Sequence, residues 1–320
     1  MTARHQRSQP LGWAALVVVY LVWGSTYLAI RVGVRDIPPL MLAALRYVAA
    51  GLLLYPIAIR SGTWAVRHND VPRGRQWLAA ALVGVLLLVL GNGGVTVAET
   101  SLNSGFAALL VATVPLWMVA FAWPIDRIRP TGWAATGLVI GLIGVAVLAG
   151  GGHGSGQLWA IVVVLGAAAS WGLGSVLAHR LSLPRRALLA AALEMLVAGI
   201  ILFIAALAHG DVGQIHWSRV GIGSWVALAY LTVLGSMLAF SAYGYALGRL
   251  PLTTVSTYAY VNPVVAVLLG AVILSEPLSA NELIGAVLVL ASVVLALRSR
   301  VTARIEASID VAARRPVTSR

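Results

Sequence analysis

Residues 41–54 have the sequence MLAALRYVAAGLLL, and residues 189–202 have the sequence LAAALEMLVAGIIL. The two stretches share six identities at a constant offset of 148 residues. The same offset relates rarer residues: Trp23-Gly24 with Trp171-Gly172, Trp77 with Trp225, Pro115 with Pro263, and Gly137 with Gly285. Trp and Pro matches carry more weight than Ala and Leu matches in an apolar chain. The offset therefore predicts two copies of one structural unit.

Each stretch lies in one of ten apolar runs, and a helix needs about 20 such residues to cross a bilayer. The runs are rich in Leu, Val, Ala and Gly without alternation, which favours helices. They span residues 12–34, 39–59, 76–97, 103–125, 131–149, 158–178, 187–208, 221–247, 252–274 and 280–297. We expect an all-α membrane protein with ten transmembrane helices. Five helices per copy make the second copy enter from the opposite side, so the two five-helix repeats are inverted.

The composition narrows the class of protein. The chain is 60% hydrophobic and 10% charged, against about 25% charged in soluble domains, which argues against a soluble enzyme. It has no Cys, so thiolate metal sites and Cys nucleophiles are excluded. Neither a Walker motif nor an HExxH or GxSxG motif is present. We expect a protein that is not an enzyme and has no metal or cofactor; a membrane-embedded enzyme and a passive channel remain the alternatives.

The charge of +12 comes from 22 basic residues, all of them Arg. Eighteen of them lie in the termini and the even-numbered connections, three lie in the odd-numbered connections, and Arg46 lies inside a span. This bias predicts a multi-pass protein of the plasma (bacterial inner) membrane with both termini in the cytoplasm. Nucleic acid is not an expected partner, because the Arg residues do not form one face. The predicted segments are a cytoplasmic N-terminus (1–11), repeat 1 (12–150), repeat 2 (158–297) and a basic cytoplasmic tail (298–320).

Several of these segments resemble a known family. They are LVWGSTYLAIRVG at 21–33, Arg46-Tyr47 in the second run, Pro115, Pro263 and SEPLSANELIG at 275–285. Together with the repeat they resemble the EamA family of the drug/metabolite transporter superfamily, over residues 12–297. The resemblance implies a secondary transporter, an exporter of small metabolites such as amino acids or related amphiphiles, that works by alternating access. Glu276 departs from the repeat, because the equivalent position in the first copy, 148 residues earlier, is not acidic.

Polar, aromatic and proline residues inside the runs mark candidate positions on a substrate pathway, because polar groups are costly in lipid and interrupted helices point to binding regions. The repeat relates Trp23 and Tyr27 to Trp171 and Ser175. Packing alone is the competing interpretation for each of them. The candidates are Trp23, Tyr27, Asn92, Thr96, Pro115, Trp117, Trp171, Ser175, Thr257, Tyr260, Asn262 and Pro263.

Three charged residues are candidates for coupling or charge stabilisation: Arg46, Glu99 and Glu194. Arg46 and Glu194 are repeat partners, but inversion puts each about 10 Å below opposite membrane faces, so we expect no ion pair between them. We expect Arg46 to bind a carbonyl or Glu99 on the outer side. Glu194 is a candidate for proton coupling, with a satisfied structural carboxyl as the alternative.

The expected partners are a small-molecule substrate, protons and the lipid bilayer. Gly137, Gly141 and Gly144 form a stripe of small residues in the fifth run. Such stripes allow close packing of transmembrane helices. A homodimer through this stripe is a further hypothesis.

Overall fold

The computed structural model describes residues 9–60, 72–127, 132–150, 155–178, 180–184, 186–247, 249–250, 252–255 and 257–297. Within these ranges every regular element is a helix. Seven helices in the described part are long and apolar enough to cross a membrane: Pro10–Gly33, Pro39–Arg60, Gly74–Ala98, Ser104–Ile125, Gln157–Ala178, Ala187–His209 and Ile222–Ala246. Three shorter apolar helices, Gly132–Leu148, Tyr258–Ile273 and Ala280–Leu295, coincide with the other expected runs. The all-helical membrane fold is confirmed; the count of ten spans stays a prediction.

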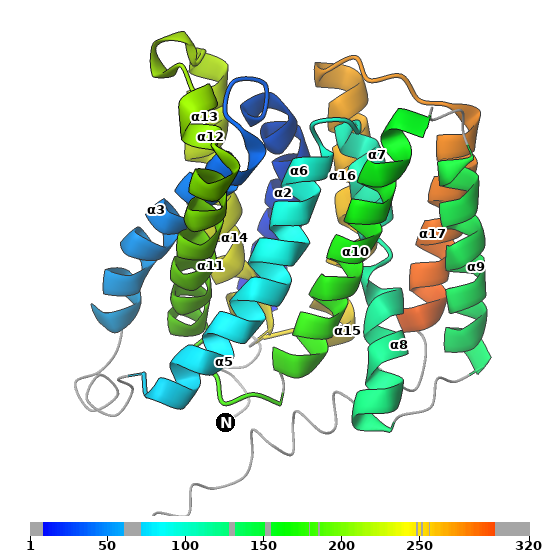
Figure 1. The fold of residues 1–320 in the computed structure, drawn as a ribbon. Coiled ribbons are helices and arrows are strands. Elements are labelled where there is room, and N and C mark those ends of the chain that lie inside the picture. Colours follow the sequence, from blue (N-terminus) through cyan, green and yellow to red (C-terminus); the bar gives the residue numbers. More distant parts are fainter. Residues whose placement is uncertain are drawn as a thin grey trace, which may run out of the picture.

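The first half of the chain contains α2 (Gln9–Gly33), α3 (Pro39–Arg60), α5 (Gly74–Gly84), η1 (Val85–Gly93), α6 (Gly94–Ala98), α7 (Ser104–Val111), α8 (Val114–Asp126) and α9 (Gly132–Ala149). The second half contains α10 (Ser155–Ala178), α11 (Ala187–His209), α12 (Asp211–Gln214), η2 (Trp217–Arg219), α13 (Ile222–Tyr230), η3 (Leu231–Leu238), α14 (Ala239–Leu247), α15 (Leu252–Val255), α16 (Tyr258–Ile273) and α17 (Ala280–Leu297). The helices stand side by side in one bundle (Figure 1).

The two halves pack against each other in a reciprocal pattern. Helix α3 packs on α11, and α9 packs on α17, each the repeat partner of the other. These pairs form opposite edges of the bundle (Figure 1). Between them, α2 of the first half packs on α14 and α16 of the second, while α10 of the second half packs on η1 and α8 of the first. The first helix of each half is therefore held by the other half.

Four of the predicted runs are not regular α-helices. The third and eighth runs each contain a π-helical segment, η1 and η3. Shifted by 148 residues, η1 covers 233–241 and so overlaps η3. The fourth run breaks between α7 and α8, just before Pro115, and the ninth breaks between α15 and α16. Such π-helical segments are rare and frequently occur at functional sites.

The predicted glycine stripe is used inside the chain. An alanine Cβ at Gly144 would lie 3.0 Å from Leu288 Cβ and Val289 N on α17, and one at Gly141 would collide with Leu116 of α8. The stripe thus allows α9 to approach its own neighbours closely. The hypothesis of a homodimer stays a prediction.

Candidate functional site

A cavity of about 90 Å³ lies between the two halves of the bundle. The first half contributes residues of α2, α3, η1, α6, α7 and α8, and the second half contributes residues of α10, α14 and α16. The residues that line it are Trp23, Thr26, Tyr27, Ile30, Arg46, Tyr47, Gly91, Asn92, Val95, Ala108, Val111, Ala112, Val114, Ala167, Ala168, Trp171, Phe240, Tyr258, Ala259, Asn262 and Pro263. Most of this lining is apolar or aromatic, as in sites for small organic ligands.

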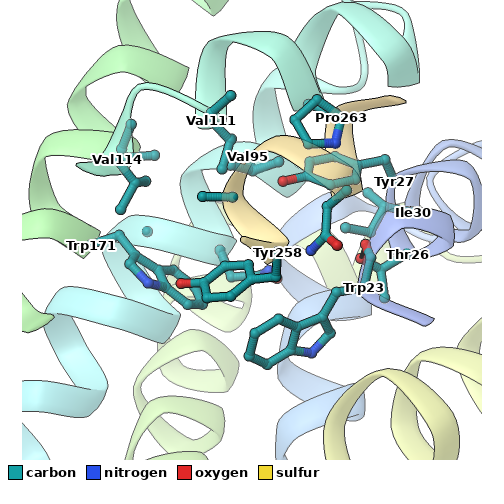
Figure 2. Close-up of a pocket in the computed structure, with 18 of the residues that line it drawn as sticks. Trp23, Thr26, Tyr27, Ile30, Val95, Val111, Val114, Trp171, Tyr258 and Pro263 are labelled. Atoms are coloured by element: carbon teal, nitrogen blue, oxygen red, sulfur yellow. Dashed lines mark hydrogen bonds between the residues drawn. The ribbon is translucent and has the colours of Figure 1, made fainter. Parts of the chain in front are cut away.

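Aromatic rings form one wall of the cavity. The ring of Trp23 lies 5.2 Å from that of Phe240 and 5.3 Å from those of Tyr243 and Tyr258. In Figure 2 the ring of Tyr258 lies between Trp23 and Trp171. The indole of Trp23 also donates a hydrogen bond to the Gly235 carbonyl at 3.2 Å. Trp23 contacts Phe240 and Tyr258 edge-on and Tyr243 at a tilt. Because these rings pack together and the indole N–H is satisfied, the wall is fixed in place.

Arg46 supplies the cationic group of the cavity. Its side chain is 3% exposed. Its Nε donates to Ser236 Oγ at 2.8 Å, and its Nη1 donates to Asn92 Oδ1 at 3.2 Å. Its guanidinium lies over the ring of Tyr47, with Cζ 4.9 Å from the ring centroid. Ser236 lies in η3 and Asn92 in η1, so both π-helical segments contribute a partner.

Half of the predicted pathway residues line the cavity: Trp23, Tyr27, Asn92, Trp171, Asn262 and Pro263. The other six lie outside its lining: Thr96, Pro115, Trp117, Ser175, Thr257 and Tyr260. Their pathway roles stay predictions.

The hydroxyls of Thr96, Ser175 and Thr257 in the second group all have hydrogen-bond partners. Thr96 donates to the Asn92 carbonyl at 2.8 Å, and Ser175 donates to the Trp171 carbonyl at 2.8 Å, each within its own helix. Thr257 hydrogen-bonds the Tyr20 hydroxyl and the Thr254 carbonyl. A hydroxyl that bonds the carbonyl one turn back can face any surroundings at little cost.

The aromatic and proline residues of the second group pack elsewhere. The ring of Trp117 stacks on that of Phe121 at 6.2 Å. Pro115 starts α8 directly after the break that follows α7, while its neighbour Val114 reaches the cavity. The rigid ring of Pro115 suits the first turn of a helix, where its missing N–H has no partner to lose.

Glu99 is fully buried at the end of α6 and does not line the cavity. Neither of its carboxylate oxygens has a hydrogen-bond partner within the described residues. Arg31 binds the main-chain carbonyls of Glu99 and Thr100 instead of the carboxylate. The sequence predicts that Arg46 binds a carbonyl or Glu99. It hydrogen-bonds the side-chain carbonyl of Asn92 and the hydroxyl of Ser236, and its interaction with Glu99 is electrostatic, without a hydrogen bond.

Glu194 lies on α11, away from the cavity, and is 7% exposed. Its main chain approaches α5 so closely that an alanine Cβ at Gly84 would lie 2.8 Å from the Glu194 carbonyl oxygen. In the described part of the chain, Arg46 makes no ion pair with Glu194. This agrees with the expectation that the inverted repeats place the two residues near opposite membrane faces. A role for Glu194 in proton coupling stays a prediction.

Two carboxylates join the halves at the end of the bundle that carries α12 and α7 (Figure 1). Asp36 accepts hydrogen bonds from Ser224 Oγ at 2.7 Å and from Gly221 N at 3.0 Å, at the start of α13. The Ser224 and Gly221 hydrogen bonds lower the pKa of Asp36. Glu276 accepts from the main chain of Ser104 at 3.0 Å and from its hydroxyl at 2.8 Å, at the start of α7. Carboxylates at helix N-termini satisfy free N–H groups and complement the helix dipole.

Several contributors to the cavity region are absent from the predicted set, among them Ser236, Phe240 and Tyr258. Tyr258 precedes Asn262 by four residues, which puts both on one helix face. Phe240 is the repeat partner of Asn92. Either relation could have identified these aromatic residues. Ser236 has Leu88 as its repeat partner, and its place beside Arg46 depends on the local backbone of η3, for which the sequence gives no signal.

Known proteins share this organisation. The EamA-like transporter family matches the chain twice, over residues 10–150 and 158–298. The "Uncharacterized inner membrane transporter YedA" of Escherichia coli is 40% identical over 294 residues, covering 91% of this chain and 92% of the relative. The "Probable terminal-alkyne amino-acid exporter" of Streptantibioticus cattleyicolor is 31% identical over 304 residues, covering 92% of this chain and 96% of the relative.

A solved structure has the same fold. One crystal structure superposes on this chain with a TM-score of 0.60 at 19% sequence identity. The superposition covers 91% of this chain and 97% of the other. At this identity the likeness concerns the fold alone.

Proposed function

This chain belongs to the EamA-like transporter family, and on that premise we propose that it is an exporter of small metabolites, amino acids or related amphiphiles, that works by alternating access between two inverted repeats. Its relatives are named as membrane transporters or exporters. The substrate class, the direction and the mechanism are our proposal.

The proposal rests on the cavity, because residues of both repeats line it. Trp23 of the first repeat and Trp171 of the second are equivalent residues, and both line it. Inverted-repeat transporters hold their substrate between the repeats, so that rocking of one repeat against the other exposes the site to each side in turn. The reciprocal packing of α2 and α10 supports this interpretation, since each repeat holds the first helix of the other.

The carboxylate contacts of Asp36 and Glu276 support a state that is closed on the outer side. Both join one repeat to the other at the same end of the bundle. The distribution of Arg residues assigns these connections to the outer side of the membrane. With these contacts formed, access from the cytoplasm is favoured. Importers and exporters both pass through such a state, so the proposed direction rests on the relative that is named an exporter.

Flux measurements test the proposal. The full-length chain is reconstituted in proteoliposomes, and labelled amino acids are screened in them and in everted vesicles, with and without a proton gradient. We expect saturable flux of at least one amino acid and exchange against the unlabelled compound. A channel would give flux that does not saturate, and an embedded enzyme would give product in detergent without vesicles; either result contradicts the proposal.

Proton coupling is tested in the same vesicles with Glu194→Gln. If Glu194 carries the coupled proton, the variant should lose the stimulation of flux by a proton gradient while retaining exchange at equal pH on both sides. Normal stimulation in the variant would exclude Glu194 from coupling. Glu99→Gln is the parallel variant, since Glu99 is the buried carboxyl without a hydrogen-bond partner in the described part of the chain.

A further inference from the structure

We infer that the cavity recognises its substrate through a carboxylate group bound by Arg46, and that the rest of the substrate is a small apolar or aromatic group. This inference rests on the proposed transport function, because it names the substrate class of the same cavity.

The hydrogen-bond and ring partners of Arg46 are all neutral. Its described contacts are a hydroxyl at Ser236, an amide oxygen at Asn92 and the ring of Tyr47. A buried charge is costly unless an opposite charge is paired with it. Hydrogen bonds to neutral oxygens orient the guanidinium. The Glu99 carboxyl interacts with Arg46 electrostatically but does not hydrogen-bond it. An anion in the cavity would be the first negative group to pair with Arg46 directly.

No acidic side chain of the cavity can serve as that anion. Among the residues that line it, all within the described ranges, Arg46 is the only one with a formal charge at neutral pH. The buried carboxyl of Glu99 lies outside the lining, and its oxygens accept no hydrogen bond from Arg46. The cavity thus has a net positive charge, which disfavours a cationic ligand and leaves Arg46 unpaired with a neutral one.

Arg46 retains N–H donors that no described residue uses. A guanidinium has five N–H groups, and the described hydrogen bonds use only Nε and one N–H of Nη1. The Nη2 group donates to no described residue. Gly235 lies next to it without a side chain, since an alanine Cβ there would lie 3.3 Å from Nη2. Planar Arg donors suit a carboxylate, which can accept two parallel hydrogen bonds.

The volume and walls of the cavity limit the rest of the ligand. A space of about 90 Å³ is large enough for several water molecules, since one water needs at least about 10–15 Å³. Such a space favours a small carboxylate over a ligand as large as a nucleotide or a long peptide. The rings of Trp23, Tyr258 and Trp171 present an apolar surface for the rest of such a ligand.

A series of isosteric probes tests the inference by isothermal calorimetry on the purified full-length protein. The probes are leucine, 4-methylpentanoate, leucinamide and 3-methylbutylamine, which share one branched side chain and differ in their charged groups. Charge-assisted hydrogen bonds predict that the two carboxylates bind at least about tenfold more tightly than the amide and the amine. Equal affinity for all four probes, or a preference for the amine, would overturn the inference.

Arg46→Gln should abolish the preference for carboxylates, and Arg46→Lys should retain part of it. The matched control is Arg219→Gln, which removes a positive charge from the exposed turn η2 and should leave all four affinities unchanged. A carboxylate preference that persists in Arg46→Gln overturns the assignment. If Arg46→Gln does not fold, the probe series on the wild-type protein still tests whether the cavity prefers carboxylates.

Failure of transport and failure of this inference give different results. Saturable flux of leucinamide with no competition by 4-methylpentanoate leaves the transporter intact and overturns the carboxylate site. Selective carboxylate binding that Arg46→Gln abolishes, without saturable flux of any probe, supports the site and contradicts the proposed function.

Discussion

Replacing Gly172 by alanine should weaken the contact between the repeats. A Cβ at this position of α10 would lie 2.7 Å from Trp117 Cβ, 3.1 Å from Met118 N and 3.2 Å from Trp117 C on α8. Carbon atoms in contact sit about 3.5–4.0 Å apart, so α10 and α8 must separate by about 0.8 Å or more. Two of the three atoms belong to the main chain, so no change of rotamer relieves the clash.

Overpacking of this kind typically costs about 1–3 kcal/mol. Each kcal/mol lowers the melting temperature by about 2–4 °C in proteins of 150–250 residues, so we expect a fall of about 2 °C or more. The assay is thermal unfolding in detergent, followed by size-exclusion chromatography of the remaining folded protein. Gly24→Ala should behave alike, because a Cβ there would lie 2.6 Å from Val265 Cβ on α16.

Gly166→Ala is the control, since it lies on the same helix and a Cβ there would meet nothing within 4 Å. Alanine is also the better helix former, so the melting temperature of this variant should not fall. If Gly172→Ala proves as stable as Gly166→Ala, the close approach of α10 to α8 does not exist.

Three further predictions concern the outer connections and the cavity. Asp36→Asn should lower the melting temperature at pH 7, and this effect should shrink as the pH falls below about 3.9. The depressed pKa of Asp36, caused mainly by its Ser224 hydrogen bond, means that its stabilisation is complete above the unfolded pKa and is lost as the pH falls through the folded pKa; an effect that stays the same throughout an acid titration would contradict this assignment. The chain has no Cys, so single cysteines report topology without background. An impermeant maleimide should label Thr100→Cys from outside the cell and Gly74→Cys only in everted vesicles, and the reverse pattern would refute the assigned orientation. Trp171→Ala should lower saturable flux more than Tyr260→Ala, because only Trp171 lines the cavity; both variants must first elute as folded protein, and equal flux would remove Trp171 from the site.

The sequence was sufficient to locate the helices, because span length and hydropathy are local properties. The described helix α3 (Pro39–Arg60) matches the predicted run 39–59, and α11 (Ala187–His209) matches 187–208. The repeat offset was equally accessible, since it depends only on residue identities. It identified Trp23 and Trp171 as equivalent, and both line the cavity.

The site itself was harder to predict because polarity within a span has two explanations. Thr96 and Asn92 lie one turn apart on the same polar face, yet only Asn92 reaches the cavity. The hydroxyl of Thr96 bonds its own helix, which an amide side chain does less readily. Sequence spacing alone cannot tell a hydroxyl that is satisfied locally from one that faces a ligand. The π-helical turns that bring Ser236 toward Arg46 are likewise set by tertiary packing.

The two repeats share a backbone but differ in their polar groups, and this difference explains why the cavity has one cationic site. The π-helical segments η1 and η3 lie at equivalent places. Their side chains do not match: Asn92 corresponds to Phe240, and Ser236 corresponds to Leu88. Arg46 itself corresponds to Glu194, which lies outside the cavity. A symmetric backbone suits rocking between two similar arrangements. A single Arg gives one charged end to an otherwise apolar and aromatic space, so a carboxylate ligand has one favoured orientation.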